Sequence, residues 1–250
     1  MKLLNFLAEK LRSISSEHGF TCDACGTEIF DYPRQRLCEE CLLSLRYNDE
    51  TRCRKCGRQT VAHGTCLDCK SAAPVFDKGF SPLSYRGKTA ALINRIKNGD
   101  RRLSYFFAEQ MCKAFLQNCP VEKGKELLVV PVPITKEGRA IRGYNQTEDL
   151  AQRAVDILRE AGLTAVMDKD ILIKTRDTKQ QKKLRLSERA ENVRGAFRVH
   201  KRTACKEKTI LLVDDIMTTG STGSECARAL KSAGANTVYF LVGASLPEEK

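Results

Sequence analysis

The chain has 250 residues, of which 42% are apolar and 30% charged, with a formal net charge of +12 and 12 cysteines. That length fits two ordinary domains, or one domain with a small appendage, and the apolar fraction excludes a chain too polar to fold. No run of residues approaches the roughly 18 apolar positions that a membrane-spanning helix needs. Twelve cysteines without an export signal favour metal binding or buried thiols over a disulfide scaffold.

The first 20 residues predict an amphipathic helix ahead of the cysteine-rich segment. Between residues 1 and 17 the apolar side chains recur at helical spacing on one face: Leu3, Leu4, Leu7, Leu11 and Ile14. We expect this face to dock on the neighbouring domain or on a partner, with a membrane-surface helix as the alternative. Because the segment is too short and too polar for a signal peptide, we expect a cytoplasmic protein, and a position peripheral to the inner face of the membrane is left open.

Eight of the cysteines fall in four Cys-x-x-Cys pairs, the spacing of metal-binding knuckles: Cys22/Cys25, Cys38/Cys41, Cys53/Cys56 and Cys66/Cys69. A gap of two residues lets both thiolates of a tight turn point at one ion, and a glycine follows where the backbone must turn, at Gly26 and Gly57. The spacing predicts two consecutive zinc sites in a double zinc-ribbon domain over 21–70. A cross-braced pairing of the same eight residues is the alternative.

Closed sites of four thiolates are structural, so the zinc is expected to fold this domain rather than to catalyse a reaction. Between residues 22 and 69, seven Lys/Arg stand against eight Asp/Glu, a net charge of −1, and each loaded tetrathiolate site adds about −2. So acidic a ribbon grips phosphates poorly, which favours scaffolding or protein contact. The other four cysteines are expected to be core or incidental thiols: Cys112, Cys119, Cys205 and Cys226.

From residue 71 to 250 the patterns of helices and strands alternate. Amphipathic helices are predicted over 88–98, 103–117, 145–161 and 222–233. Apolar strands are predicted over 127–132, 171–173, 210–213 and 237–242. Alternation of strand and helix implies an α/β domain built on a parallel sheet.

The sharpest functional signal follows the strand at 210–213. Two adjacent carboxylates, Asp214 and Asp215, stand at its carboxyl end, where open α/β sheets bind ligands. A turn rich in hydroxyls then leads into a helix, and its backbone N–H and hydroxyl groups can wrap a phosphate monoester: Thr218, Thr219, Gly220, Ser221 and Thr222. Because the carboxylates can accept hydrogen bonds from a vicinal diol, the segment predicts a ribose 5-phosphate site. No Walker lysine is present, which argues against a nucleoside triphosphate loop.

The segment 210–222 resembles the phosphoribosyl pyrophosphate (PRPP) signature of the type I phosphoribosyltransferases. That resemblance implies that Asp214 and Asp215 bind the 2′- and 3′-hydroxyls of the ribose and that residues 218–222 hold its 5′-phosphate. It also implies Mg²⁺, which bridges pyrophosphate and ribose oxygens in that family. The fold expected from the whole pattern is a type I phosphoribosyltransferase-like domain over 71–250, preceded by the small zinc-ribbon domain.

Further motifs extend the resemblance over nearly the whole chain. The four cysteine pairs precede Pro131-Val132-Pro133, then Arg142-Gly143-Tyr144-Asn145-Gln146, then Arg176-x-Thr178-x-x-Gln181. This order resembles the ComF family of bacterial competence-associated proteins. It implies a loop at 134–138, after the first strand of the body, that grips pyrophosphate, and a flexible loop at 174–195 that closes over the reaction centre. The residues assigned to these two loops are Thr135, Lys136, Arg139, Arg142, Arg176 and Gln181.

The positive charge is concentrated in and beside the second of these loops. Residues 174–208 carry thirteen Lys/Arg against four Asp/Glu, a net charge of +9 in 35 residues. A fully ionised PRPP has about five negative charges and can use several of these cations, while the rest can follow a nucleic-acid backbone or form a solvated face.

Two functions are expected from this resemblance. The first is a phosphoribosyltransferase that displaces pyrophosphate from PRPP with an unidentified nucleophile and is associated with natural competence and DNA uptake. The second is a non-catalytic adaptor with the same fold that binds single-stranded DNA or proteins of the competence machinery. Homodimers are common in the resembled fold, so a homodimer is a further expectation.

Overall fold

The computed structural model describes residues 21–48, 51–118, 124–176 and 191–248, without the side chains of Lys136, Ile141 and Arg142. The helix expected within 1–20 lies outside these residues. The chain divides into two compact units, Met1–Leu45 and Arg46–Lys250. The division falls after Leu45, whereas the sequence predicts a boundary at residue 70. The second set of cysteines therefore groups with the sheet.

The described part of the first unit is a cysteine knuckle followed by a short helix, α2 (Glu39–Leu43). The N–H of Gly26 donates to the carbonyl of Cys22 at 2.8 Å, and Gly26 has a φ of +81°, which only glycine adopts without strain. Helix α2 begins directly after Cys38 and carries the buried Cys41. The knuckle and the helix start thus bring both pairs of the first set together.

The second unit begins with the same arrangement. The N–H of Gly57 donates to the carbonyl of Cys53 at 2.9 Å, and Gly57 has a φ of +77°. Helix α3 (Leu67–Ser71) begins directly after Cys66 and carries the buried Cys69. The repeat of knuckle and helix that the cysteine spacing predicts is present in both units.

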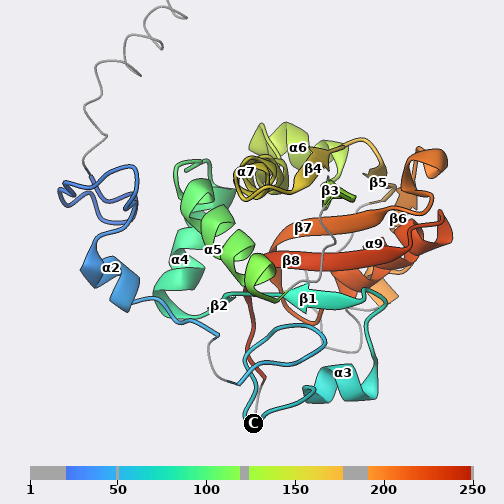
Figure 1. Ribbon diagram of the computed structural model, residues 1–250, viewed down its shortest axis with the longest axis horizontal. Coiled ribbons are helices and arrows are strands. Elements are labelled where there is room, and N and C mark those ends of the chain that lie inside the picture. Colours follow the sequence, from blue (N-terminus) through green and yellow to red (C-terminus); the bar gives the residue numbers. More distant parts are fainter. Residues whose placement is uncertain (1–20, 49–50, 119–123, 177–190, 249–250) are drawn as a thin grey trace, which may run out of the picture. The chain divides into compact units, whose positions relative to one another are not determined.

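A parallel sheet forms the body of the second unit (Figure 1). Its strand order is β1-β8-β7-β3-β4, and β2 also pairs with β8. The strands span Lys78–Phe80 (β1), Leu83–Ser84 (β2), Glu126–Pro131 (β3), Thr164–Met167 (β4), Thr209–Met217 (β7) and Thr237–Ser245 (β8). Every pairing in this sheet is parallel, as the sequence predicts. Apart from it, β5 (Leu172–Lys174) pairs antiparallel with β6 (Phe197–Val199).

Helices cover both faces of the sheet, because the chain crosses over in opposite directions. Strand β3 is followed by α6 (Lys136–Arg142), α7 (Gln146–Glu160) and then β4, whereas β7 is followed by α9 (Ser221–Ser232) and then β8. Right-handed crossovers that run in opposite directions place α7 and α9 on opposite faces. Helices α4 (Gly87–Lys97) and α5 (Leu103–Asn118) pack against each other, and α5 packs on α7.

The alternation of side chains along the strands builds one core on each face. Val130, Ile210 and Phe240 belong to the core that α9 covers with Leu230. This core also contains the second set of cysteines and Phe76. The second cysteine set therefore groups with the sheet because it shares the hydrophobic core of the sheet.

The point where the crossovers diverge lies between the adjacent strands β3 and β7. In open α/β sheets, the crevice outside the carboxyl ends of two such strands is where ligands bind. Strand β7 runs to Met217, further than the predicted 210–213. Asp214 and Asp215 therefore lie within the strand, and two more residues follow them before it ends. The fold thus places the residues of the phosphate-binding prediction at this crevice.

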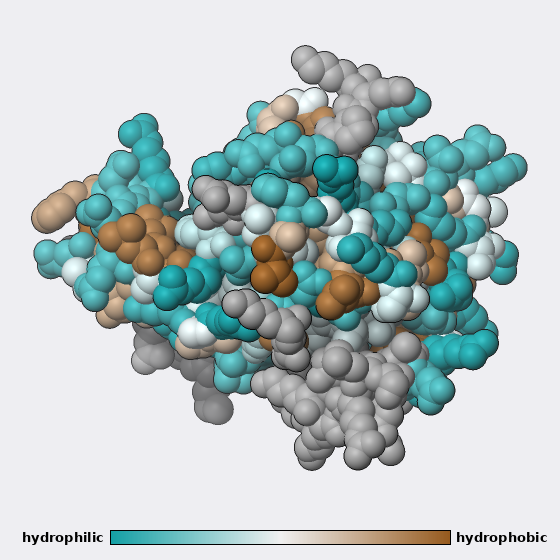
Figure 2. Space-filling view, turned by 90° about the horizontal axis from the view of Figure 1, so that it is seen from below, coloured by the Kyte–Doolittle hydropathy of each residue, from teal (hydrophilic) through white to brown (hydrophobic). Residues whose placement is uncertain are grey.

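The face drawn in Figure 2 is mostly hydrophilic, with a few separate hydrophobic patches. Among the described residues, no helix combines the length and the apolar character that crossing a membrane requires.

Candidate functional site

Two carboxylates lie near the carboxyl end of the central strand β7, and they have different neighbours. Asp215 is buried, at 6% exposure, and its Oδ2 accepts a hydrogen bond from Nε2 of Gln146 at 2.9 Å. Nζ of Lys97 lies 3.4 Å from the same oxygen. Asp214 is only half-buried, and its Oδ1 accepts the backbone N–H of Asp215 at 2.9 Å. One carboxylate is thus held by side chains, while its neighbour is more exposed and contacts a backbone N–H.

The titration of Asp214 reflects this position. Desolvation, followed by the charge of Asp215, raises the pKa of Asp214 to about 8. The backbone N–H of Asp215 and the cations Lys97 and Lys174 lower this pKa but do not offset the first two effects. Cations or hydroxyl donors close to this carboxylate favour its ionised form and lower its pKa.

The residues after β7 form a loop at the start of helix α9. Gly220 has a φ of +82° and is the residue directly before the helix. Oγ of Ser221 lies 2.7 Å from Oγ1 of Thr219, which also accepts the backbone N–H of Ser221 at 3.3 Å. Among the described residues, no backbone carbonyl accepts the N–H of Thr219 or of Gly220. Donors at the N-terminus of a twelve-residue helix suit a phosphate group.

The start of helix α7 is fixed to the residue that follows β3. Oγ1 of Thr147 donates to the carbonyl of Val132 at 2.6 Å, and Nδ2 of Asn145 donates to the same carbonyl at 3.3 Å. Asn145 also caps the helix, because its side chain accepts the N–H of Thr147. This anchoring delivers Gln146 to Asp215, so the tertiary structure joins the Asn145-Gln146 motif to the end of β7.

The residues predicted to grip pyrophosphate form a helix rather than a loop. Thr135 caps α6 by accepting the N–H of Gly138 at 3.1 Å, and Gly143, with a φ of +75°, ends the helix. These two caps explain why the loop expected around 134–138 becomes helical from Lys136 onward. Arg139 is ion-paired with Glu148 of helix α7. The side chains of Lys136 and Arg142 are not among those the structure describes.

The second predicted loop, 174–195, is described at its two ends. Nη2 of Arg176 donates to the carbonyl of Arg194 at 2.8 Å, and the N–H of Thr175 donates to the carbonyl of Ala196 at 2.9 Å. The pairing of β5 with β6 continues this contact. Both ends of the segment are thus held side by side, and Gln181 lies outside the described residues.

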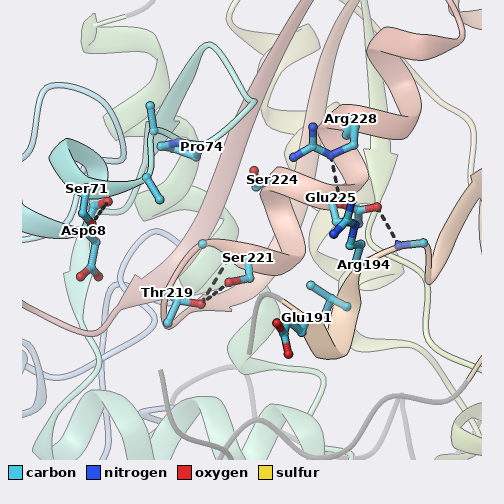
Figure 3. A pocket seen from close by; sticks show the side chains of 15 residues that line it. Asp68, Ser71, Pro74, Glu191, Arg194, Thr219, Ser221, Ser224, Glu225 and Arg228 are labelled. Carbon is cyan, nitrogen blue, oxygen red and sulfur yellow. Dashed lines mark hydrogen bonds and ion pairs between the residues drawn. The ribbon is translucent and has the colours of Figure 1, made fainter. Parts of the chain in front are cut away.

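Two cavities flank these elements. One, of about 840 Å³, lies between α3, the phosphate loop (residues 218–222) and α9. Figure 3 shows Asp68, Ser71 and Pro74 on one side of it and Arg194, Glu225 and Arg228 on the other, with Thr219 and Ser221 between them. The other cavity, of about 670 Å³, is lined by residues that follow β3 and by a group of cationic side chains: Arg139, Lys169, Lys174 and Lys201.

The two sets of cysteines form two separate clusters, each of which fits a zinc ion. Within each set of four, the sulfur atoms all lie within 4.8 Å of one another. Cys25 and Cys38 have their sulfurs 3.6 Å apart, and Cys56 and Cys66 have theirs 3.8 Å apart. Tetrahedral zinc with bonds of about 2.3 Å separates its sulfurs by about 3.8 Å. The sets follow the chain order, so the cross-braced pairing does not match the structure.

The remaining cysteines behave as the sequence predicts where they are described. Cys112, Cys205 and Cys226 are fully buried, and Cys119 lies outside the described residues. Burial raises the pKa of Cys112 to about 12, so this thiol stays protonated and unreactive.

The sequence did not single out several residues that the structure brings to the site. Gln146 ends the motif at 142–146, but nothing in the sequence around it indicates a contact with Asp215, which lies 69 positions away. Lys97 is the last residue of helix α4, and Lys174 ends β5. Arg58, close to the second cysteine cluster, donates to the carbonyl of Thr218 at 2.8 Å. Only the packing of the elements reveals these neighbours.

The comparison with known proteins agrees with this arrangement. The family model "Phosphoribosyl transferase domain" matches residues 149–249, which include β7, the phosphate loop and α9. The chain is 26% identical to "Competence protein ComFC" of Bacillus subtilis over 236 residues, covering 90% of each chain. It is 27% identical to "DNA utilization protein YhgH" of Escherichia coli K12 over 205 residues, covering 81% of this chain and 87% of that one.

A third relative is "Competence protein F" of Haemophilus influenzae, which is 25% identical over 226 residues and covers 87% of this chain and 86% of its own length. All three matches extend well beyond the 101 residues, 149–249, of the phosphoribosyl transferase domain. Together with two cysteine clusters ahead of a parallel sheet and a loop that follows paired carboxylates, these matches support the assignment of the chain to the ComF family.

Proposed function

We propose that this protein binds PRPP at the carboxyl end of β7 and acts as a phosphoribosyltransferase in natural competence and DNA uptake. One observation carries the proposal: Asp214 and Asp215 lie near the carboxyl end of a buried strand, and Thr219 and Gly220, whose N–H groups no described backbone carbonyl accepts, follow within five residues. A vicinal diol and a phosphate monoester separated by one ribose ring match these two sets of groups. Asp214 and Asp215 would hold the hydroxyls, and residues 218–222 the 5′-phosphate.

The proposed reaction exchanges the group on C1 of the ribose. The bond between C1 and the pyrophosphate oxygen breaks, and pyrophosphate leaves with the bonding electrons. A nucleophile forms a new bond to C1, and its proton passes to solvent. The cations that line the cavity beside β3 are suited to the negative charge that develops on pyrophosphate: Arg139, Lys169, Lys174 and Lys201. The other residues predicted for the two loops would also bind pyrophosphate: Thr135, Lys136, Arg142, Arg176 and Gln181.

Mg²⁺ fits the site by the chemistry of its donors. Carboxylate oxygens are the ligands that this hard cation prefers, and Asp214, with its raised pKa, gains most from a nearby cation. When bound with PRPP, Mg²⁺ would neutralise pyrophosphate oxygens. The chain itself would orient the ribose through Asp215, which Gln146 and Lys97 hold in place. Zinc would serve the two cysteine clusters as a structural ion.

The wider role is proposed from the names of the relatives. The Bacillus and Haemophilus proteins are named for competence, and the Escherichia coli protein for DNA utilization. Single-stranded DNA and proteins of the competence machinery are the partners this suggests, with a homodimer as the expected assembly. A location in the cytoplasm, or at the inner face of its membrane, follows from the same proposal.

The test is to incubate the purified protein with Mg²⁺, PRPP and a panel of bases and amines, and to measure both PRPP binding by calorimetry and pyrophosphate release. Asp215→Asn is the site variant, and Asp156→Asn, on an exposed part of α7, is the matched control. We expect binding and release that only the site variant loses. Binding without release, together with salt-sensitive retention of single-stranded DNA, would favour the adaptor. Absence of PRPP binding by the wild type would overturn the proposal.

A further inference from the structure

A buried arginine links the second cysteine cluster to the phosphate loop. Arg58 is only 4% exposed and stands two residues after Cys56. Its Nη2 donates to the carbonyl of Thr218 at 2.8 Å, and its Nη1 donates to Oδ2 of Asp68 at 2.6 Å. Asp68 lies in helix α3, between Cys66 and Cys69. A single guanidinium therefore joins both halves of the cluster to the start of the phosphate loop.

The backbone of Arg58 belongs to the metal-binding knuckle itself. The N–H of Cys53 donates to the carbonyl of Arg58 at 2.9 Å, across the same turn in which Gly57 donates to Cys53. An ion held by the four sulfurs fixes this turn, because two of its ligands are Cys53 and Cys56. The position from which the Arg58 side chain departs is thus set by the cluster.

The knuckle is in turn held firmly against the sheet. A Cβ atom on Gly57 would lie 2.7 Å from the carbonyl oxygen of Gly79 in β1, and the N–H of Gly79 donates to the carbonyl of Lys55 at 2.7 Å. On the far side, the carboxylate of Glu248 accepts the N–H of Leu67 at 2.6 Å. The cluster is therefore a fixed support for Arg58 rather than a loosely attached appendage.

The carbonyl that Arg58 holds controls the direction of a phosphate-binding donor. In a planar trans peptide, the C=O of Thr218 and the N–H of Thr219 point in opposite directions. Fixing the carbonyl toward Arg58 consequently turns the N–H of Thr219 away from the cluster. That N–H has no backbone acceptor among the described residues, and Thr219 lines the cavity of about 840 Å³ beside α9.

We propose that Arg58 is a positioning residue through which the second cysteine cluster holds the phosphate loop in the conformation that binds a phosphate monoester. The identity of that ligand as the 5′-phosphate of PRPP rests on the proposed function. Arg58 does not touch the ligand; it acts through the peptide between Thr218 and Thr219. The metal at the second cluster thereby supports ligand affinity without taking part in the reaction.

The experiment compares Arg58→Lys with Arg54→Lys in the full-length, zinc-loaded protein. Arg54 is an exposed residue of the same knuckle, so the control matches the chemical change. Lysine keeps the charge at position 58 but lacks the planar fork that spans Thr218 and Asp68. Three quantities are measured: zinc content, affinity for PRPP and for inorganic phosphate, and hydrogen exchange of the amides of residues 218–222.

We expect Arg58→Lys to retain its zinc but to bind both ligands about tenfold more weakly, the scale of one charge-assisted hydrogen bond. Its loop amides should exchange faster, and those of Arg54→Lys should not. Removing zinc from the wild type should speed the same amides and should add little in Arg58→Lys. Unchanged affinity and exchange in a zinc-loaded Arg58→Lys protein would overturn the proposal.

Two further outcomes are decisive as well. If Arg58→Lys fails to fold, Asp68→Asn replaces it, because it loosens the guanidinium while Arg58 keeps its bond to Thr218. A smaller effect in the same direction supports the proposal, and no effect contradicts it. If the wild type binds no PRPP, the proposed function fails, and the exchange of the loop amides still decides whether Arg58 positions the loop.

Discussion

Gln146 and Asp215 are 69 positions apart in the chain, and Nε2 of Gln146 donates to Oδ2 of Asp215 at 2.9 Å. The bond joins the first residue of α7 to the end of β7. With Lys97 on the same oxygen, it fixes the orientation of a buried carboxylate. Asp215 is thus held as an acceptor, whereas the neighbouring Asp214 is half-buried and has a raised pKa. The two adjacent aspartates therefore have different surroundings.

Replacing Gln146 by glutamate should disrupt this arrangement. Gln146→Glu places a second carboxylate against Asp215 in a buried site, where like charges repel strongly. We expect PRPP affinity to fall at least tenfold and the free energy of unfolding to fall by about 1–3 kcal/mol. Calorimetry and urea denaturation measure the two effects.

Gln152→Glu is the control for this change. Gln152 lies on the same helix, is exposed, and also donates to an aspartate, Asp156, at 3.1 Å. Water screens that pair, so its effect should stay within about 0.5 kcal/mol. If the two substitutions changed PRPP affinity and the free energy of unfolding equally, the contact with Asp215 would contribute no more than the exposed contact with Asp156.

Asp214→Asn should stabilise the protein without ligand while it abolishes PRPP binding. The raised pKa means that ionising Asp214 in the folded chain is unfavourable, and asparagine removes this cost while it keeps the shape of the side chain. At pH 8 the gain should be on the order of a few kcal/mol. Thermal denaturation with and without PRPP measures both effects. A lower melting temperature in the absence of ligand would contradict the assigned electrostatics.

The same pKa predicts how stability depends on pH. The folded chain keeps the Asp214 proton up to about pH 8, whereas an unfolded aspartate loses it near its ordinary pKa of 3.8. The folded state therefore binds more protons between these values, and the contribution of Asp214 to the free energy of unfolding falls as the pH rises through this window. The difference between wild type and Asp214→Asn, measured by urea denaturation from pH 5 to 8, isolates this contribution. A difference that stays constant with pH would exclude it.

Gly57→Ala should be strongly destabilising. A Cβ atom there would lie 2.7 Å from the backbone oxygen of Gly79, in addition to the strain of a φ of +77°. Gly143 is the matched control, because its φ is +75° and no atom lies within 4 Å of its added Cβ. Gly143→Ala should cost about 1 kcal/mol, the strain alone. Gly57→Ala should cost about 1–3 kcal/mol more. Equal melting temperatures for the two variants would show that the knuckle is not tightly packed on β1.

Local patterns predicted a large part of the fold. The helices at 103–117 and 145–161 agree closely with α5 and α7, and the strand at 237–242 lies within β8, because each has a long apolar periodicity of its own. Strands β1 and β4 were not predicted. Both are short, and β4 has exposed positions, so their pairing with longer neighbours, rather than their own composition, makes them strands.

The two predicted loops show the same limit at the site. The turn at 218–222 was predicted because its residue types suit a phosphate cradle and follow a clear strand. The segment at 134–138 was predicted as a loop, but the caps Thr135 and Gly143 make helix α6. Helix capping depends on which side chains form hydrogen bonds with the backbone at the ends of the helix. The resemblance to the family motif gave no information on these bonds.

The sequence by itself predicted the four Cys-x-x-Cys pairs, the parallel α/β body and the paired carboxylates before a hydroxyl-rich turn, because each of these patterns lies in residues close together in the chain. Only the tertiary structure sorted the cysteine pairs into two clusters in chain order. Only the tertiary structure decided that Gln146 and Lys97 hold Asp215 and that Arg58 reaches Thr218, 160 positions away. It also decided that the second cysteine cluster groups with the sheet. These contacts follow from how the helices and the knuckle pack on the strands, and burial of a shared core, not local spacing, sets that packing.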